Sequence, residues 1–229
     1  MVRTSDNMIT YDNLTYSGDL INISSWNGAL AIANQPNRII IVCTHVEMGG
    51  GVNRSVSSIT YNGVGLTKIH DYYDTDANDT RVEIWYLVAP ATGSNSIVVT
   101  WSGNVNRGRV FAISYYGVHQ ASPVNASQEE SDTATSPSIS VTPTVFDTII
   151  LAFYGISNVD AVVNSVGAGQ TLRHSSVGSA FRTAYTDKTQ KAPSASASVV
   201  NLSQSSPTPM IAVALRPYPT GRAGIMAIM

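Results

Sequence analysis

Apolar and polar residues alternate with a period of two along most of the chain. Between positions 81 and 88, the side chains of Val82, Ile84, Tyr86 and Val88 share one face, and the odd-numbered residues share the other. Such alternation is typical of a β-strand with two different faces, because successive side chains of a strand point in opposite directions. The run predicts a strand, and helix-type periodicity is nearly absent elsewhere in the chain.

The same alternation predicts a series of further strands, separated by turn residues such as Asn62-Gly63 and Ser102-Gly-Asn104. Two segments, Ile39–Val42 and Ile149–Tyr154, are apolar on both faces, so we expect them to be central strands covered on both sides. Residues 24–33 fit either a short turn or another strand. The two doubly apolar segments belong to the predicted strands Arg38–Val46 and Thr148–Tyr154. The remaining predicted strands are Ser57–Tyr61, Leu66–His70, Ser96–Trp101, Arg109–Tyr116, Ser138–Val141, Thr171–Ser175, Phe181–Lys188, Ser196–Leu202 and Met210–Arg216.

Many short strands with turn signals between them predict an all-β fold, a two-sheet antiparallel β-sandwich of jelly-roll type. We expect residues 1–217 to form one domain, with residues 1–34 as an N-terminal segment packed on it. The polar stretch Asn125–Pro137 is interpreted as a long exposed loop rather than a boundary, because neither side alone has enough strands for two sheets. Residues 218–229 are expected to form an apolar C-terminal tail.

The composition narrows the classes of partner. Charged residues make up 12% of the 229 residues, against about 25% in a typical globular protein. The net charge of −2 offers no basic field for nucleic acid or an anionic membrane. We find neither a signal peptide nor an apolar run long enough for a membrane helix. A surface of hydroxyls and amides suits secreted, cell-surface and virion proteins, and the lone Cys43 is expected to be a buried, inert thiol.

Several segments carry a resemblance to a known group of modules. They are Val56–Lys68, Glu83–Gly93, Ser114–Pro123, Val166–Thr171 and Ile211–Pro217, in the same order along the chain. Together they resemble jelly-roll β-sandwich modules of large bacterial surface proteins and phage structural proteins. The resemblance spans residues 35–217. It implies the fold and a surface or virion location, but no catalytic residues.

No pattern of catalytic residues stands out. A serine hydrolase elbow and the usual zinc motifs are both missing from the sequence. The histidines His45, His70, His119 and His174 are scattered, and each is interpreted as a surface or hydrogen-bonded structural residue. Glu83 is the only acid at the centre of a convincing strand, so it lacks the partner that a glycosidase needs. We therefore expect a non-enzymatic protein.

The segment from His70 to Asp79 is the strongest candidate for a metal site. Asp74, Asp76 and Asn78 follow the spacing that begins a calcium loop, with Asp71 and Asp79 nearby. The glycine and the final glutamate of that motif are absent. Two interpretations stay open, a solvated hairpin loop or a calcium site, and no other cofactor is expected.

Two tyrosines in this segment suggest a second kind of ligand. Tyr72 and Tyr73 could stack on the apolar face of a sugar ring, and packing within the fold is the alternative. A carbohydrate-binding module is therefore an alternative function.

The C-terminal tail predicts an assembly contact. Its apolar side chains Ile225, Met226, Ile228 and Met229 would expose a contiguous apolar segment to water. We expect the tail to dock on another copy of the chain or on a shell or capsid protein. The leading expectation is a self-assembling phage capsid decoration, tail or fibre component, located in a virion or on an extracellular surface; a subunit of an extracellular filament is a further alternative.

Overall fold

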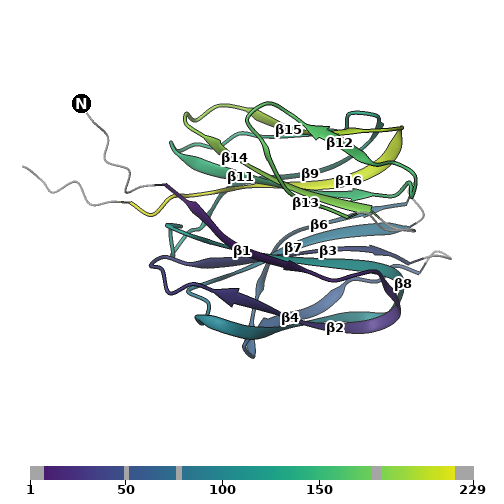
Figure 1. Cartoon of the computed structure of the whole chain (residues 1–229), viewed down its shortest axis with the longest axis horizontal. Coiled ribbons are helices and arrows are strands. Elements are labelled where there is room, and N and C mark those ends of the chain that lie inside the picture. The colour runs from purple at the N-terminus through teal and green to yellow at the C-terminus, as the bar shows by residue number, and fades with distance from the viewer. Residues whose placement is uncertain (1–7, 49–51, 76–78, 177–181, 220–229) are drawn as a thin grey trace, which may run out of the picture.

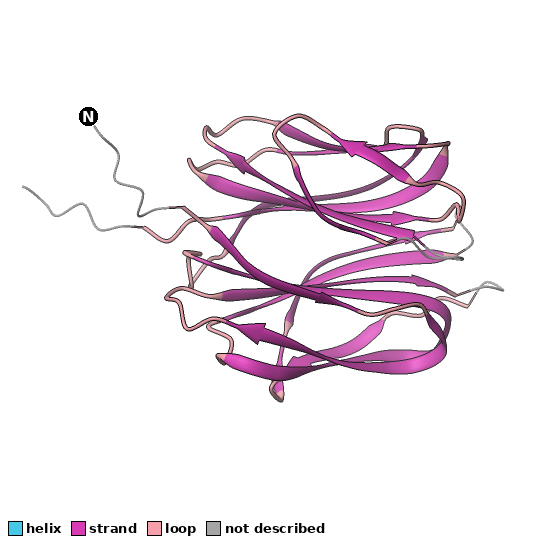
Figure 2. Cartoon of the chain, viewed as in Figure 1, coloured by secondary structure: helices cyan, strands magenta, loops and turns pink. Residues whose placement is uncertain are grey.

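The computed structural model describes residues 8–48, 52–75, 79–176 and 182–219, and these residues form an all-β protein of antiparallel strands (Figures 1 and 2). No helix occurs among them, so none of the described segments is a helix that could cross a membrane. The all-β prediction is confirmed.

The strands of the first half of the chain form one hydrogen-bonded sheet that folds over itself. The long strand β8 holds this sheet together, because its first part pairs with β2 and β4 and its second part pairs with β1 and β3. The order continues from β3 through β7 to β6. These strands are β1 (Thr10–Tyr16), β2 (Leu20–Ile32), β3 (Ile39–Glu47), β4 (Val56–Tyr61), β5 (Val64–Gly65), β6 (Thr67–Asp74), β7 (Thr80–Val88) and β8 (Gly93–Tyr116).

The second half repeats this strand order. Its five-stranded sheet runs β13-β14-β11-β16-β9, which matches β6-β7-β3-β8-β1, and its three-stranded sheet β10-β15-β12 matches β2-β8-β4. The single strand β8 thus corresponds to the two strands β15 and β16. The strands are β9 (Val124–Ala134), β10 (Ser138–Val141), β11 (Thr148–Ile156), β12 (Val163–Val166), β13 (Thr171–Ser175), β14 (Arg182–Gln190), β15 (Ser196–Leu202) and β16 (Ser206–Leu215).

A short sequence repeat accompanies the repeated topology. Residues 63–70 and 167–174 both read G-x-G-x-T-x-x-H, and each segment leads into the outermost strand of its five-stranded layer. His70 lies opposite Ile84, and His174 lies opposite Tyr185, just after a register shift in both cases. The two histidines are therefore structurally equivalent.

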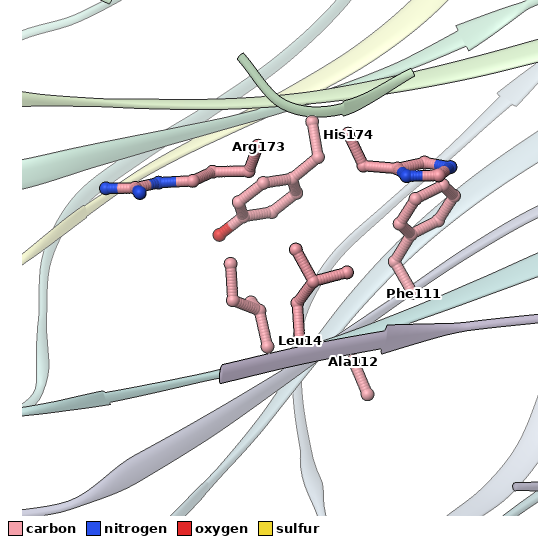
Figure 3. A pocket seen from close by; sticks show the side chains of 7 residues that line it. Leu14, Phe111, Ala112, Arg173 and His174 are labelled. Carbon is pink, nitrogen blue, oxygen red and sulfur yellow. The ribbon is translucent and has the colours of Figure 1, made fainter. Parts of the chain in front are cut away.

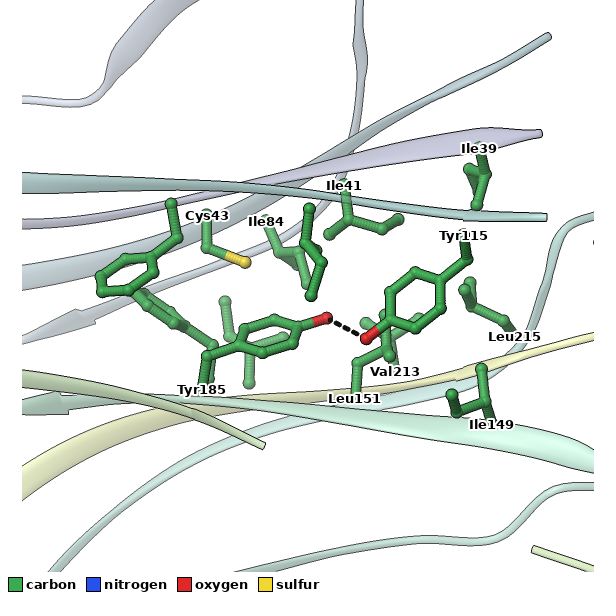
Figure 4. Packing of buried hydrophobic residues seen from close by; sticks show 14 of the residues in the cluster. Ile39, Ile41, Cys43, Ile84, Tyr115, Ile149, Leu151, Tyr185, Val213 and Leu215 are labelled. Atoms are coloured by element: carbon green, nitrogen blue, oxygen red, sulfur yellow. Dashed lines mark hydrogen bonds between the residues drawn. The ribbon is translucent and has the colours of Figure 1, made fainter. Parts of the chain in front are cut away.

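The strands are stacked in four β layers (Figure 1), and three apolar cores lie between these layers. The middle core lies between the two larger layers and contains Ile41 and Cys43 of β3 together with Ile149 and Leu151 of β11 (Figure 4). Each half has a further core between its larger and its smaller layer. Both central strands, β3 and β11, are buried on their two faces, which confirms the prediction made from their doubly apolar sequences.

Local predictions were confirmed at some positions and wrong at others. Asn62 and Gly63 have φ angles of 50° and 76°, as expected for a tight hairpin turn. The expected loop over 125–137 is wrong for most of its length, since β9 occupies Val124–Ala134 as an edge strand. The turn expected at Ser102–Asn104 lies inside the continuous β8, and residues 24–32 belong to β2.

Candidate functional site

The two halves meet along two seams that are equivalent in topology. At one seam β6 of the first half lies beside β9 of the second, and at the other β13 lies beside β1. His70 contacts Glu129 across the first seam, and the His174 ring packs at a tilt against that of Tyr16 across the second, with 4.0 Å between ring centroids. Such reciprocal contacts are those of an approximate two-fold arrangement.

A β-bulge explains why both seams receive side chains from the edge strands. The register shifts between Lys68 and His70 in β6 and between Leu172 and His174 in β13. The extra residues are Ile69 and Arg173. A bulge re-aims the side chains around it, so Ile69 packs on the middle core while His70 reaches β9, and Arg173 and His174 both reach β1.

The seam between β1 and β13 holds a buried polar network. Arg173 Nε donates to Asp187 Oδ2 at 2.8 Å, and the hydroxyl of Tyr115 donates to the same oxygen at 2.7 Å. The hydroxyl of Tyr115 also lies 3.4 Å from that of Tyr185, as the dashed line in Figure 4 shows. Asp187 is 2% exposed, so this carboxylate is satisfied inside the protein by two donors from different strands.

Burial and charge act together on this network. Burial raises the pKa of Tyr115 and of Tyr185 well above the ordinary value, so both phenols stay protonated. Burial alone would lower the pKa of Arg173, but the hydrogen bond and the charge of Asp187 outweigh it, and the net shift is upward. The network is therefore a fixed ion pair with neutral phenols around it.

A groove of about 370 Å³ opens beside this network, between β1 and the strands β13 and β14. Its walls include Thr10, Tyr11, Thr171, Arg173 and Thr189. The guanidinium of Arg173 lies 4.3 Å from the centre of the Tyr11 ring. Asp187 binds Nε of Arg173. Among the described residues, no side chain or carbonyl accepts a hydrogen bond from the two outer nitrogens of Arg173, which can therefore bind a ligand.

A much smaller apolar cavity, of about 10 Å³, lies further along the same seam. Leu14, Phe111 and Ala112 line it from the first half, and Arg173 and His174 from the second (Figure 3). Burial, together with the nearby charge of Arg109, lowers the pKa of His174. The seam thus passes from a polar, open groove to a closed apolar contact.

The opposite seam carries different chemistry. His70 Nδ1 lies 2.8 Å from Glu129 Oε2, and His70 Nε2 lies 2.7 Å from Ser127 Oγ. Further along, Ser131 Oγ donates to Asp74 Oδ2. Polar pairs therefore join β6 to β9, whereas rings in tilted contact join β1 to β13 at the other seam.

Three of the residues predicted for calcium binding, Asp71, Asp74 and Asp79, lie in the described part of the chain and contact different partners. Asp71 faces the outer side of β6, where Lys68 Nζ lies 2.6 Å from it and Arg81 lies 3.2 Å away. Asp74 faces the opposite side and contacts Ser131, while Asp79 accepts a hydrogen bond from Tyr73. Asp76 and Asn78 lie outside the described residues. Within the described part of the chain, no group of three or more metal-binding side chains is assembled.

The predicted tyrosine pair is also split. Tyr72 packs against the middle core, whereas Tyr73 packs against the core on the other face of β6. Neighbouring residues of a strand point to opposite faces, so the two rings do not form one stacking platform. Glu83 is fully buried, and its carboxylate binds the Val56 amide at 2.6 Å and Lys68 Nζ at 2.8 Å.

Cys43 is buried in the middle core, as expected, and burial raises the pKa of its thiol well above the ordinary value. The apolar tail residues Ile225, Met226, Ile228 and Met229 lie outside the described residues. The sequence interpretation missed Arg173, Asp187, Ser127 and Glu129. The repeated G-x-G-x-T-x-x-H segment is the signal that could have pointed to the two seams.

Comparisons with protein-family models, with curated proteins and with solved structures gave no match for this chain. The geometry of the two seams is therefore the basis for a functional argument.

Proposed function

We propose that this chain is a structural building block of a virion or an extracellular surface, a role that requires no enzymatic step. The observation that carries the proposal is the stack of three apolar cores, which joins two sandwiches through their larger layers. A close-packed interior of this kind resists deformation. A rigid block with few charged groups on its surface suits a repeated assembly better than a protein that must open and close.

We further propose that each half is a jelly roll. The first four strands of the first half alternate between its layers: β1 and β3 belong to the larger layer, and β2 and β4 to the smaller one. The first part of β8 then pairs in the smaller layer and its second part in the larger one. The second half follows the same alternation, with β15 and β16 in place of β8.

Assembly through the C-terminal tail is the part of this proposal that is tested first. A truncation after Pro219 keeps the hydrogen bond from the Tyr218 amide to the Gly117 carbonyl, so the described fold stays intact. We expect the full chain to form an oligomer, or to bind a shell protein, and the truncated chain to be a monomer with an unchanged melting temperature. Light scattering coupled to size exclusion measures this.

A variant with serine at Ile225, Met226, Ile228 and Met229 is the matched control, because it keeps the tail length but removes its apolar surface. It should behave as the truncated chain does. An oligomer of the same size in both variants would contradict the role of the tail. Electron microscopy of the assembled full chain separates a closed shell component from an open extracellular filament.

Carbohydrate binding is a second candidate, and the groove beside Arg173 is the observation that favours it. The groove is lined by the hydroxyl-bearing residues Thr10, Thr171 and Thr189, by the aromatic Tyr11 and by Arg173. Such a mixture of ring and polar groups suits a sugar that carries a carboxylate. A glycan array should then show binding that Arg173→Met abolishes and that Lys191→Met, at an exposed position, preserves.

Calcium binding stays a prediction. If the Asp71–Asp79 segment holds an ion, millimolar calcium should raise the melting temperature above that measured with EDTA, because a ligand that binds only the folded state stabilises it. An unchanged melting temperature would remove this site.

A further inference from the structure

We propose that Ser127, His70 and Glu129 form a serine acyl-transfer triad at the seam between β6 and β9, with carboxylic esters as its substrates. The inference goes beyond the structural role proposed above and does not depend on it. It concerns His70 of the first half and two residues of β9 in the second half, which meet because the two halves pack together.

The distances follow the arrangement that activates a serine. His70 Nδ1 lies 2.8 Å from Glu129 Oε2, and His70 Nε2 lies 2.7 Å from Ser127 Oγ. With Nδ1–H donating to the carboxylate, Nε2 carries a lone pair and accepts the hydroxyl proton of Ser127. The carboxylate therefore lies at Nδ1 and the nucleophilic hydroxyl at Nε2, which is their arrangement around the histidine of a catalytic triad.

The strands hold the three side chains in this order. Ser127 and Glu129 are two residues apart in β9, so they share one face of that strand. His70 reaches this face because the bulge after Lys68 turns its side chain toward the second half. The side chains of His70 and Glu129 are 30% and 36% exposed, and Ser127 is partly exposed, so a substrate in solution can reach the hydroxyl.

The sheet register supplies a backbone donor next to the nucleophile. The Ser157 amide, which follows β11, donates to the carbonyl of Pro207 in β16. Because the backbone groups of successive residues in a strand point to opposite sides, the odd-numbered residues of β16 point toward β11 and the even-numbered ones toward β9. Ser127 lies opposite the odd-numbered Val213. Its amide therefore points away from β16 and toward the outer edge of β9, where it can stabilise a developing oxyanion.

The reaction that this geometry supports is ester hydrolysis in two steps. Ser127 Oγ attacks the ester carbonyl carbon while its proton passes to His70 Nε2, and the alcohol leaves with that proton as the C–O bond breaks. Water then attacks the acyl carbon and gives a proton to His70, and His70 returns that proton to Ser127 Oγ as the acyl C–O bond breaks and the carboxylic acid leaves. Glu129 acts as a positioning residue that keeps Nδ1 protonated.

Ser131 provides an internal comparison. It lies on the same face of β9, four residues after Ser127, and its hydroxyl donates to Asp74 directly. No histidine stands between this serine and its acid. A carboxylate alone binds the hydroxyl but lacks the base-and-acid function of imidazole, so Ser131 is the matched control for reactivity.

The test combines covalent labelling with turnover. The full-length protein is incubated with a fluorophosphonate, the adduct is located by peptide mass spectrometry, and hydrolysis of 4-nitrophenyl acetate is followed in parallel. We expect an adduct on Ser127 and none on Ser131. Ser127→Ala should abolish labelling, whereas Ser131→Ala should leave the labelling rate unchanged.

Two further variants separate a catalytic role from a structural one. His70→Ala should lower the labelling rate by about 10²-fold or more, and added imidazole should restore part of it. Glu129→Gln should slow labelling without a change in melting temperature. Absence of an adduct on Ser127 in the folded protein, or hydrolysis that is equal in the wild type and Ser127→Ala, would overturn the proposal.

Discussion

His45 of β3 packs directly against Gly155 of β11, the structurally equivalent position in the other half. A Cβ atom added at Gly155 would lie 2.6 Å from His45 Nε2 and 2.8 Å from a methyl carbon of Val82. The equivalence follows from the registers, since Ile39 lies opposite Tyr115 in β8 and Ile149 opposite Leu215 in β16. The space at this contact is thus taken by a histidine of one half, where the equivalent residue of the other half has no side chain.

Gly155→Ala should destabilise the protein by about 1–3 kcal/mol, because His45 and Val82 must move to accommodate the methyl group. Urea unfolding measures the change. Gly18→Ala is the control, since a Cβ there meets nothing within 4 Å. Adding His45→Ala to Gly155→Ala should recover part of the loss, and equal midpoints for wild type and Gly155→Ala would contradict the contact.

The stability of the protein should fall as the pH drops below about 6.5. Burial lowers the pKa of His45 from 6.5 to about 3. Since the unfolded chain takes up a proton at a pH where the folded one does not, stability from the neutral histidine is complete above 6.5 and is lost toward 3. Each pH unit in that window costs about 1.4 kcal/mol from this residue alone.

His45→Gln should flatten this pH dependence, because glutamine does not titrate. His174 also has a lowered pKa, so the wild type and the variant are compared over the same pH range. Urea midpoints at pH 7, 6, 5 and 4 are sufficient. Parallel pH profiles for the two proteins would show that His45 is not the group responsible.

Asp187→Ala should cost about 3 kcal/mol, since it leaves the buried hydroxyl of Tyr115 and the guanidinium of Arg173 without their shared acceptor. Lys191→Ala removes a charge that is 66% exposed and should change the stability by less than about 1 kcal/mol. Thermal unfolding of both variants gives the comparison. A loss of similar size in both would mean that the Asp187 network contributes little.

Both halves should unfold in one transition, because the middle core is built from residues of both. All three tryptophans, Trp26, Trp85 and Trp101, belong to the first half, whereas circular dichroism reports on strands from the whole chain. The urea transitions followed by fluorescence and by circular dichroism should therefore coincide. Separate midpoints would show that the halves unfold independently.

The sequence was informative where burial dictates the pattern. The alternation in 81–88 correctly separated Val82, Ile84 and Tyr86 in the middle core from Trp85 and Leu87 in the other core. The doubly apolar segments became the central strands β3 and β11. The burial of these positions can be predicted from the sequence, because a side chain that contacts only apolar groups must itself be apolar.

The contacts at the two seams could not be predicted from the sequence in the same way. Strand β9 is polar on the face that meets β6, since Ser127 and Glu129 pair with His70 there, so its sequence looks like a loop. Arg173 and His174 face the same seam only because of a bulge, which the alternation does not reveal. Both functional candidates depend on contacts between residues that are far apart in the chain.

The repeated strand order has a consequence for the history of the protein. Two equivalent halves that face each other reciprocally have the geometry of a homodimer whose subunits became joined by gene duplication and fusion. Once fused, each copy could change alone: Asp187 stands where the first half has Tyr86, and Arg173 where it has Ile69. The two equivalent seams accordingly differ in chemistry: one borders a groove with an arginine, and the other joins a serine to a histidine.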